Sequence, residues 1–154
     1  MKISKIQKER TIILPEKYLA FLANIEAGED YFFNEFPEEY PDFEGRCWAF
    51  YDESLLSEEV EMIGVGKAPA HQQLALYLKC YQQSTKKGEI HSPEGQIAIG
   101  RVANAFVIAE DDGDFLYLDP EDNFSVWVFY HDGCDVKKVS NSMAEWLKRA
   151  KAAS

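Results

Sequence analysis

The chain has 154 residues and a mass of 17.6 kDa, the usual size of one folded domain. Hydrophobic residues make up 46% and aromatic residues 14%, so the chain is too apolar to be intrinsically disordered. Its apolar runs are shorter than the roughly eighteen residues of a membrane span, and residues 1–5 lack the apolar stretch of a signal peptide. We therefore expect a single domain, over residues 1–154, that is cytoplasmic and has no membrane partner.

The charge of the chain is strongly negative and unevenly distributed. It carries 27 acidic and 16 basic residues, for a net charge of −11. Residues 26–61 hold 13 acidic residues and one basic residue, Arg46, so this segment carries −12 and the remainder +1. A polyanionic surface repels nucleic acid, which excludes that class of partner, and it attracts a basic protein. The alternative is that the acidity only keeps the protein soluble.

The three cysteines argue against redox and metal chemistry. Cys47, Cys80 and Cys134 form no Cys-x-x-Cys pair, and their number is odd. In a cytoplasmic chain, thiols of this kind stay reduced and mostly buried. His71 and His91 are isolated in the sequence, and a surface position is expected for both rather than metal ligation. We expect no metal and no cofactor.

Apolar residues at helical spacing predict three helices. The first begins at Pro15, which suits a first helical position because proline has no N–H to leave unpaired there. The second begins at Pro69, and the third is opened by Ser142 and Glu145, which form a capping box. These helices are expected over residues 15–27, 69–84 and 142–152, with Gly28 in the turn that ends the first.

A run of strands is expected between the second and third helices. Their connections at residues 110–113 and 119–124 are short, and short connections require antiparallel neighbours. The last strand is apolar on both faces, which is typical of a central strand. The four strands are expected over residues 96–99, 105–109, 114–118 and 125–130.

The other segments give weaker patterns. Residues 47–51 are expected to form an earlier strand, and residues 88–96 a polar loop. Residues 55–63 are ambiguous between a short helix and an irregular strand edge. Residues 29–45 contain two prolines and no period, which predicts a long loop with room for a short strand. The order of elements predicts an α+β fold with a twisted, mostly antiparallel sheet packed by helices.

Short motifs in this order resemble the SUKH superfamily. They are Leu14-Pro15 with Tyr18, Phe21 and Leu22; Trp48-Ala49-Phe50; Ile99-Gly100; residues 112–119; residues 126–133; and Ser142-Met143 with Glu145, Trp146 and Leu147. The superfamily contains fungal cell-wall synthesis regulators and bacterial immunity proteins of polymorphic toxin systems. One departure concerns the Asn-Gly-Gly turn of the family after its first helix. Residues 24–28 differ from that turn, so the following loop is expected to take another path.

Two clusters invite a catalytic or metal interpretation. His131 and Cys134 are a base type and a nucleophile type, but neighbours at the end of a strand point in opposite directions. Residues 110–114 are acidic, but they lack the residue order of a calcium loop. We expect both clusters to be turns, with no catalytic residue.

The acidic and aromatic segment after the first helix is the candidate binding site. Aromatic side chains supply the buried anchors of interfaces, and carboxylates attract a basic surface. A solubilising loop whose aromatic side chains turn inward is an equally open interpretation. The candidate protein-binding residues are Asp30, Tyr31, Glu35, Phe36, Glu38, Glu39, Tyr40 and Asp42, with Asp111, Asp112 and Asp114 of the acidic hairpin.

We therefore expect a protein-binding module that is not an enzyme. The resemblance implies an immunity protein that neutralises a cognate toxin by binding it stoichiometrically, and the acidic charge of the chain favours a basic toxin, such as a nuclease. A regulatory scaffold, as the fungal members imply, is the alternative. A small hydrolase is a third interpretation, for which the sequence shows no converging polar groups. The sequence leaves the partner's identity and the oligomeric state open.

Overall fold

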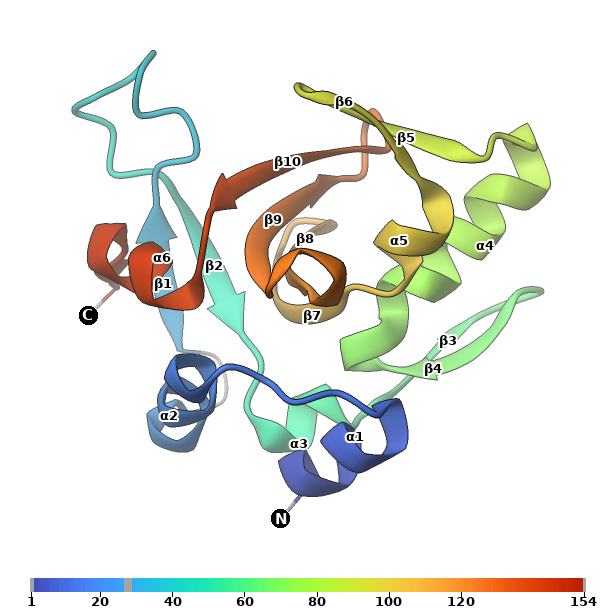
Figure 1. Cartoon of the computed structure of the whole chain (residues 1–154), viewed down its shortest axis with the longest axis horizontal. Helices are drawn as coiled ribbons and strands as arrows, with labels where there is room; N and C mark the ends of the chain where they lie inside the picture. The colour runs from blue at the N-terminus through green and yellow to red at the C-terminus, as the bar shows by residue number, and fades with distance from the viewer. Residues whose placement is uncertain (1, 27–28, 154) are drawn as a thin grey trace.

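The computed structural model describes residues 2–26 and 29–153 (Figure 1). Its helices are α1 (Lys2–Arg10), α2 (Glu16–Asn24), α3 (Glu53–Leu56), α4 (Gln73–Thr85), α5 (Ile99–Ala103) and α6 (Met143–Arg149), with 3-10 helices at Ala70–Gln72 and Pro120–Asp122. Its strands are β1 (Asp30–Phe33), β2 (Arg46–Phe50), β3 (Glu59–Met62), β4 (Gly66–Pro69), β5 (Glu89–Ser92), β6 (Gly95–Ala98), β7 (Phe106–Asp111), β8 (Asp114–Asp119), β9 (Ser125–Tyr130), β10 (Asp135–Ser140) and β11 (Lys151–Ala152).

Nine of these strands form one sheet, in the order β11-β1-β2-β7-β8-β9-β10-β5-β6. Neighbouring strands are antiparallel except β10 and β5, which are parallel, and β3 and β4 form a separate two-stranded ribbon. The pairs β7–β8 and β8–β9 are antiparallel, as their short connections predict. The α+β fold with a mostly antiparallel sheet is confirmed.

Aromatic side chains join the sheet to its helices. Trp146 of α6 is fully buried and stacks on Phe33 of β1, with ring centroids 4.8 Å apart. Tyr77 of α4 meets Phe129 of β9 edge-on, at 5.3 Å. Five successive residues of β9, from Ser125 to Phe129, are buried, so this strand is covered on both faces as expected of a central strand. None of the described helices is long and apolar enough to cross a membrane.

The structure corrects several predicted elements. Residues 88–96 contain the strand β5 rather than only a loop. The strand predicted over residues 96–99 is β6, which ends at Ala98, where α5 follows. The third predicted helix ends at Arg149, and the next residues pair with β1 as β11. The ambiguous residues 55–63 divide between α3 and β3. The turn expected at Gly28 lies outside the described residues.

The α1 helix, which the sequence pattern did not predict, is fastened by Arg10. The Arg10 guanidinium donates to the carbonyl oxygen of Asn104 at 2.7 Å and lies 3.3 Å from Nδ1 of the buried His71. Burial and the nearby Arg10 charge lower the pKa of His71 to about 4, so its ring is neutral and can accept this hydrogen bond.

The antiparallel order brings three connections to the same end of the sheet. They are the connection from β1 to β2 at residues 34–45, the β7–β8 turn at residues 112–113, and the β9–β10 turn at residues 131–134. Glu26, Glu29 and residues 51–61 flank β1 and β2 at the opposite end, where Phe50 N–H donates to the carbonyl oxygen of Glu29. The acidic segment, residues 26–61, was predicted to form one surface, but it is divided between the two ends of the sheet.

Candidate protein-binding site

Residues 34–45, called here the acidic loop, present aromatic side chains to solvent. Phe36, Tyr40 and Phe43 are 36%, 57% and 55% exposed. They are three of the five large hydrophobic side chains that are exposed in the described part of the chain. Four exposed carboxylates lie among them: Glu38, Glu39, Asp42 and Glu44. Figure 1 shows this loop projecting beyond β1 and β2.

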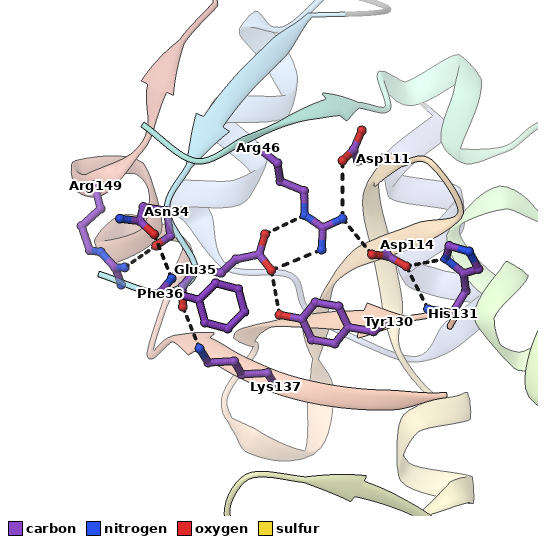
Figure 2. A network of polar contacts seen from close by, with 10 residues as sticks. All are labelled: Asn34, Glu35, Phe36, Arg46, Asp111, Asp114, Tyr130, His131, Lys137 and Arg149. Carbon is purple, nitrogen blue, oxygen red and sulfur yellow. Dashed lines mark hydrogen bonds and ion pairs between the residues drawn. The ribbon is translucent and has the colours of Figure 1, made fainter. Parts of the chain in front are cut away.

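Hydrogen bonds inside the acidic loop fix its backbone. The Asn34 side-chain oxygen accepts from Phe36 N–H at 2.9 Å, and its amide donates to the carbonyl oxygen of Tyr40 at 2.7 Å. Tyr40 N–H in turn donates to the carbonyl oxygen of Phe36 at 2.9 Å. Arg149 of α6 donates to the carbonyl oxygen of Asn34 at 2.9 Å (Figure 2). Although irregular, the loop is therefore held in one conformation at its base.

Glu35 turns inward from the acidic loop and pairs with Arg46, the first residue of β2. Arg46 Nε lies 2.7 Å from Glu35 Oε2, and Nη2 lies 3.2 Å from Oε1, which makes a bidentate pair (Figure 2). The Tyr130 hydroxyl donates to the same Oε1 at 2.7 Å. Burial and the Glu35 carboxylate raise the pKa of the Tyr130 phenol above its usual value, so it remains a donor. The Glu35 side chain is only 4% exposed and is well satisfied.

Arg46 extends the same network to the β7–β8 turn. Its Nη1 donates to Asp114 Oδ2 at 2.7 Å and lies 3.4 Å from Asp111 Oδ2. Asp114 Oδ1 accepts from the backbone N–H of His131 at 2.8 Å and lies 2.6 Å from Nδ1 of its ring. Burial raises the pKa of Asp114, but hydrogen bonds from His131 and Arg46 outweigh this effect and lower it overall. The network therefore joins the three connections at this end of the sheet.

Aromatic rings and Lys137 complete the support of the acidic loop. The Arg46 guanidinium lies over the Trp48 ring, 4.4 Å from its centroid. Lys137 of β10 donates to the Glu35 carbonyl oxygen at 2.7 Å, and its ammonium lies 3.9 Å from the centroid of the Phe36 ring. Phe36 is thus seated on the sheet along one face, while Tyr40 projects freely.

Six of the predicted binding residues lie exposed at this end of the sheet: Phe36, Glu38, Glu39, Tyr40, Asp42 and Asp112. Asp111 lies beside them, partly buried against Arg46. The other four candidate residues are placed differently. Glu35 and Asp114 are tied up in the internal network, Asp30 lies at the start of β1, and Tyr31 packs edge-on against Phe50 in the core.

The sequence reasoning overlooked residues that belong to this surface. Phe43 and Glu44 are exposed on the acidic loop, and the Asp132 side chain on the neighbouring turn is 96% exposed. The supporting role of Arg46 was also missed. It had a signal, because Arg46 is the single basic residue among the 13 acidic residues of 26–61. An isolated cation at the base of an acidic loop is well placed to neutralise an inward carboxylate.

The structure places His131 and Cys134 in a turn, as expected. His131 Nδ1 faces Asp114, and Nε2 lies 3.2 Å from Asp132 Oδ1 rather than facing a hydroxyl or thiol. Cys134 is buried at a positive φ of 50°, and burial raises the pKa of its thiol to about 11. A thiol in this state is a poor nucleophile at neutral pH.

Substituting His131 by Ala should lower stability most below about pH 6.5 and progressively less above it. The hydrogen bond to Asp114 raises the pKa of the imidazole above its usual value, so the folded state holds the proton more tightly than the unfolded chain. This stabilisation is fully present below the unfolded pKa and is lost as the pH rises through the folded pKa. Chemical denaturation of both proteins from about pH 5 to about pH 9 measures the difference. A difference independent of pH would contradict this account of the pair.

One of the comparisons with known proteins supports the α+β fold described above. No curated protein and no solved structure matches the chain. The model of the SMI1 / KNR4 family (SUKH-1) matches residues 2–149, nearly the whole length. The chain therefore belongs to the SMI1 / KNR4 family (SUKH-1).

Proposed function

We propose that this protein is a cytoplasmic immunity protein whose acidic loop binds and neutralises a basic toxin without catalytic turnover. The observation that carries the proposal is the loop itself. Three exposed aromatic side chains stand among four exposed carboxylates, on a backbone fastened to the sheet. Family membership is consistent with an immunity or regulatory role.

Each part of the acidic loop suits protein binding. Tyr40 and Phe43 can supply the aromatic anchors that dominate interface energies. The carboxylates can speed encounter with a basic surface, such as that of a nuclease, which must be basic to bind phosphates. The hydrogen bonds at Asn34 and the Glu35–Arg46 pair restrict the free loop, so less conformational entropy is lost on binding.

A regulatory scaffold is the alternative function, and it would use the same surface for another basic partner. A hydrolase is the competing class. It would use His131 as its base, but Nε2, the ring nitrogen left to take a proton from a nucleophile, lies 3.2 Å from Asp132 Oδ1. Loss of all biological activity in a His131→Ala variant that folds normally would favour the hydrolase over the binding protein.

The proposal is tested by capturing the partner from the native host with two variants of equal charge change. One variant replaces Glu38, Glu39 and Asp42 of the acidic loop by Lys. The control replaces Glu26, Glu58 and Glu61 by Lys; these come from the same acidic segment but lie at the opposite end of the sheet.

We expect wild type and control to capture one basic protein and the acidic-loop variant to lose most of it, because like charges would then face each other. Equal capture by both variants would contradict the assignment of the acidic loop. A gene for the captured protein directly upstream would identify the pair as toxin and immunity protein.

A further inference from the structure

The residues that follow α6 run along the edge of the sheet beside the acidic loop. Arg149 ends α6, and Ala150 is extended, with a φ of −80° and a ψ of 157°. Residues 151–152 then form β11, which pairs with β1 at two positions. Figure 1 shows α6 beside β1, at the base of the acidic loop. We call residues 149–153 the strap, because they connect α6 to the outer edge of β1.

The strap contacts both ends of the acidic loop. At the first residue of the loop, Arg149 donates to the carbonyl oxygen of Asn34 at 2.9 Å (Figure 2). Near the last residue, Lys151 Nζ lies 3.2 Å from Glu44 Oε1. Among the four exposed carboxylates of the loop, Glu44 is the one that forms an ion pair within the described chain. The loop is therefore fastened to the strap at its start and near its end.

The two halves of the strap differ in how firmly they are held. At the α6 end, Arg149 also donates to the carbonyl oxygen of Val139 at 3.0 Å, and its guanidinium lies 4.4 Å from the centroid of the Phe33 ring. Beyond Ala150, both residues of β11 are exposed, so this strand buries little apolar surface. Ala150 is thus the junction between an anchored helix end and a loosely held strand.

Only weak contacts hold β11 in place. The Lys151 and Glu44 side chains are 75% and 46% exposed, and exposed ion pairs are individually weak. At the far end of the strap, Ala153 N–H donates to the carbonyl oxygen of Asp30 at 3.0 Å. Elements with few buried contacts open locally, without unfolding of the whole domain. β11 is therefore able to detach while α6 stays in place.

We propose that the strap sets the orientation of the acidic loop and that detachment of β11 at Ala150 loosens the loop and weakens partner binding. Detachment leaves the contact with Asn34 intact and releases the loop near Glu44. A loop that is fastened in advance loses less conformational entropy when it binds. The effect on the partner rests on the proposed function, whereas the coupling between strap and loop does not.

Hydrogen exchange of the full chain, followed by nuclear magnetic resonance, tests this coupling without a partner. Phe43 N–H, which donates to the carbonyl oxygen of Tyr40 at 3.1 Å, reports on the released end of the loop. Phe36 N–H, which donates to the Asn34 side chain at 2.9 Å, reports on the end that stays fastened. Lys151→Glu places two carboxylates side by side, so it should speed exchange at Phe43 by at least about threefold and affect Phe36 less.

Two further variants separate the strap from a single ion pair and from overall charge. Ala153→Pro removes the donor to Asp30, and it should also speed exchange at Phe43, because β11 has only two paired residues and opens as a unit. Lys79→Glu makes the same charge change at an exposed position of α4 and should leave exchange at Phe43 as in wild type.

A charge swap provides the rescue. Adding Glu44→Lys to Lys151→Glu restores an ion pair of reversed polarity, so exchange at Phe43 should return toward the wild-type rate. Exchange at Phe43 that is unchanged in Lys151→Glu would overturn the strap. So would an increase that is absent from Ala153→Pro, or one that Lys79→Glu reproduces.

Dissociation kinetics with the captured partner tests the effect on binding. Lys151→Glu adds negative charge beside the acidic loop, and charge alone would then favour a basic partner. The strap predicts the opposite, dissociation about threefold faster than that of wild type. Where the variant with Lys at positions 38, 39 and 42 does associate more slowly, unchanged or slower dissociation in Lys151→Glu overturns the role of the strap in binding. Normal association of that Lys variant instead refutes the proposed function, and the exchange rates alone then decide whether the strap controls the loop.

Discussion

Replacing Arg46 by Met should lower the free energy of unfolding at neutral pH by about 3 kcal/mol or more. The substitution keeps most of the side-chain volume but leaves Glu35, whose side chain is 4% exposed, with a buried charge and only the Tyr130 hydroxyl as a side-chain donor. Asp114 loses its 2.7 Å partner as well. Urea denaturation measures the change. Arg149→Met is the control, because Arg149 donates only to carbonyl oxygens in the described structure and should lose about 1 kcal/mol.

A second substitution distinguishes the loss of the Glu35–Arg46 ion pair from the loss of the packing of the Arg46 side chain. Adding Glu35→Gln to Arg46→Met removes the uncompensated charge, so the double variant should be more stable than Arg46→Met alone. Additive losses from the two substitutions would contradict the assignment of Glu35 and Arg46 as a coupled pair. In that case the carboxylate would be reaching solvent.

Replacing Gly45 by Ala should also destabilise the protein strongly, by about 3 kcal/mol. Gly45 has a φ of +100°, a conformation that side chains disfavour, and its new Cβ would lie 2.0 Å from the carbonyl oxygen of Phe33. The two ends of the acidic loop approach so closely that only glycine fits between them. The clash is with backbone, so relieving it must move either β1 or the loop.

Gly64 provides the matched control for this prediction. It also has a positive φ, of +81°, but nothing lies within 4 Å of a Cβ built there. Gly64→Ala should therefore lower the free energy of unfolding by only about 1 kcal/mol, the cost of a positive φ for alanine. Urea denaturation compares the two variants, and limited proteolysis should cut the acidic loop faster in Gly45→Ala. Equal losses for both variants would show that the close approach to Phe33 is unimportant.

The parts of the fold that the sequence predicted correctly are those with strong local signals. The β7, β8 and β9 strands are apolar runs joined by short turns, so neither their type nor their pairing depends on distant residues. Ser142 caps α6 by accepting from Glu145 N–H at 3.1 Å, as the capping box predicts.

One missed element, β10, lies inside the sheet between β9 and β5, and Lys137 and Lys138 interrupt its apolar pattern. Others, such as β5, α1 and β11, lie at the margins of the core, where few apolar residues are needed. In β5 only Ile90 and Ser92 are buried, so its alternation resembles a polar loop. In α1 only Ile3 and Ile6 are buried. β11 has two residues and is defined solely by its pairing with β1. Such elements depend on partners far along the chain, which a local pattern does not record.

In the candidate site, too, local features could be predicted from the sequence and long-range contacts could not. The composition of residues 34–45 indicated exposed carboxylates, but it left open whether the aromatic side chains face solvent, as Phe36, Tyr40 and Phe43 do. It could not show that the β1–β2 hairpin carries Glu26, Glu29 and residues 51–61 to the other end of the sheet. Nor could it show which carboxylates turn inward, because the partners of Glu35 include Tyr130, which is 95 residues away.

The most direct test of the acidic loop is the kinetics of association with the captured partner at about 50 mM and about 500 mM salt. At low salt, the variant with Lys at positions 38, 39 and 42 should associate at least about tenfold more slowly than wild type, and high salt should reduce the difference. Tyr40→Ala should mainly accelerate dissociation, since Tyr40 is a free aromatic anchor, whereas Ile63→Ala on the β3–β4 ribbon should not. An association rate that is unchanged in the Lys variant at low salt would contradict the assignment of the acidic loop as the binding site.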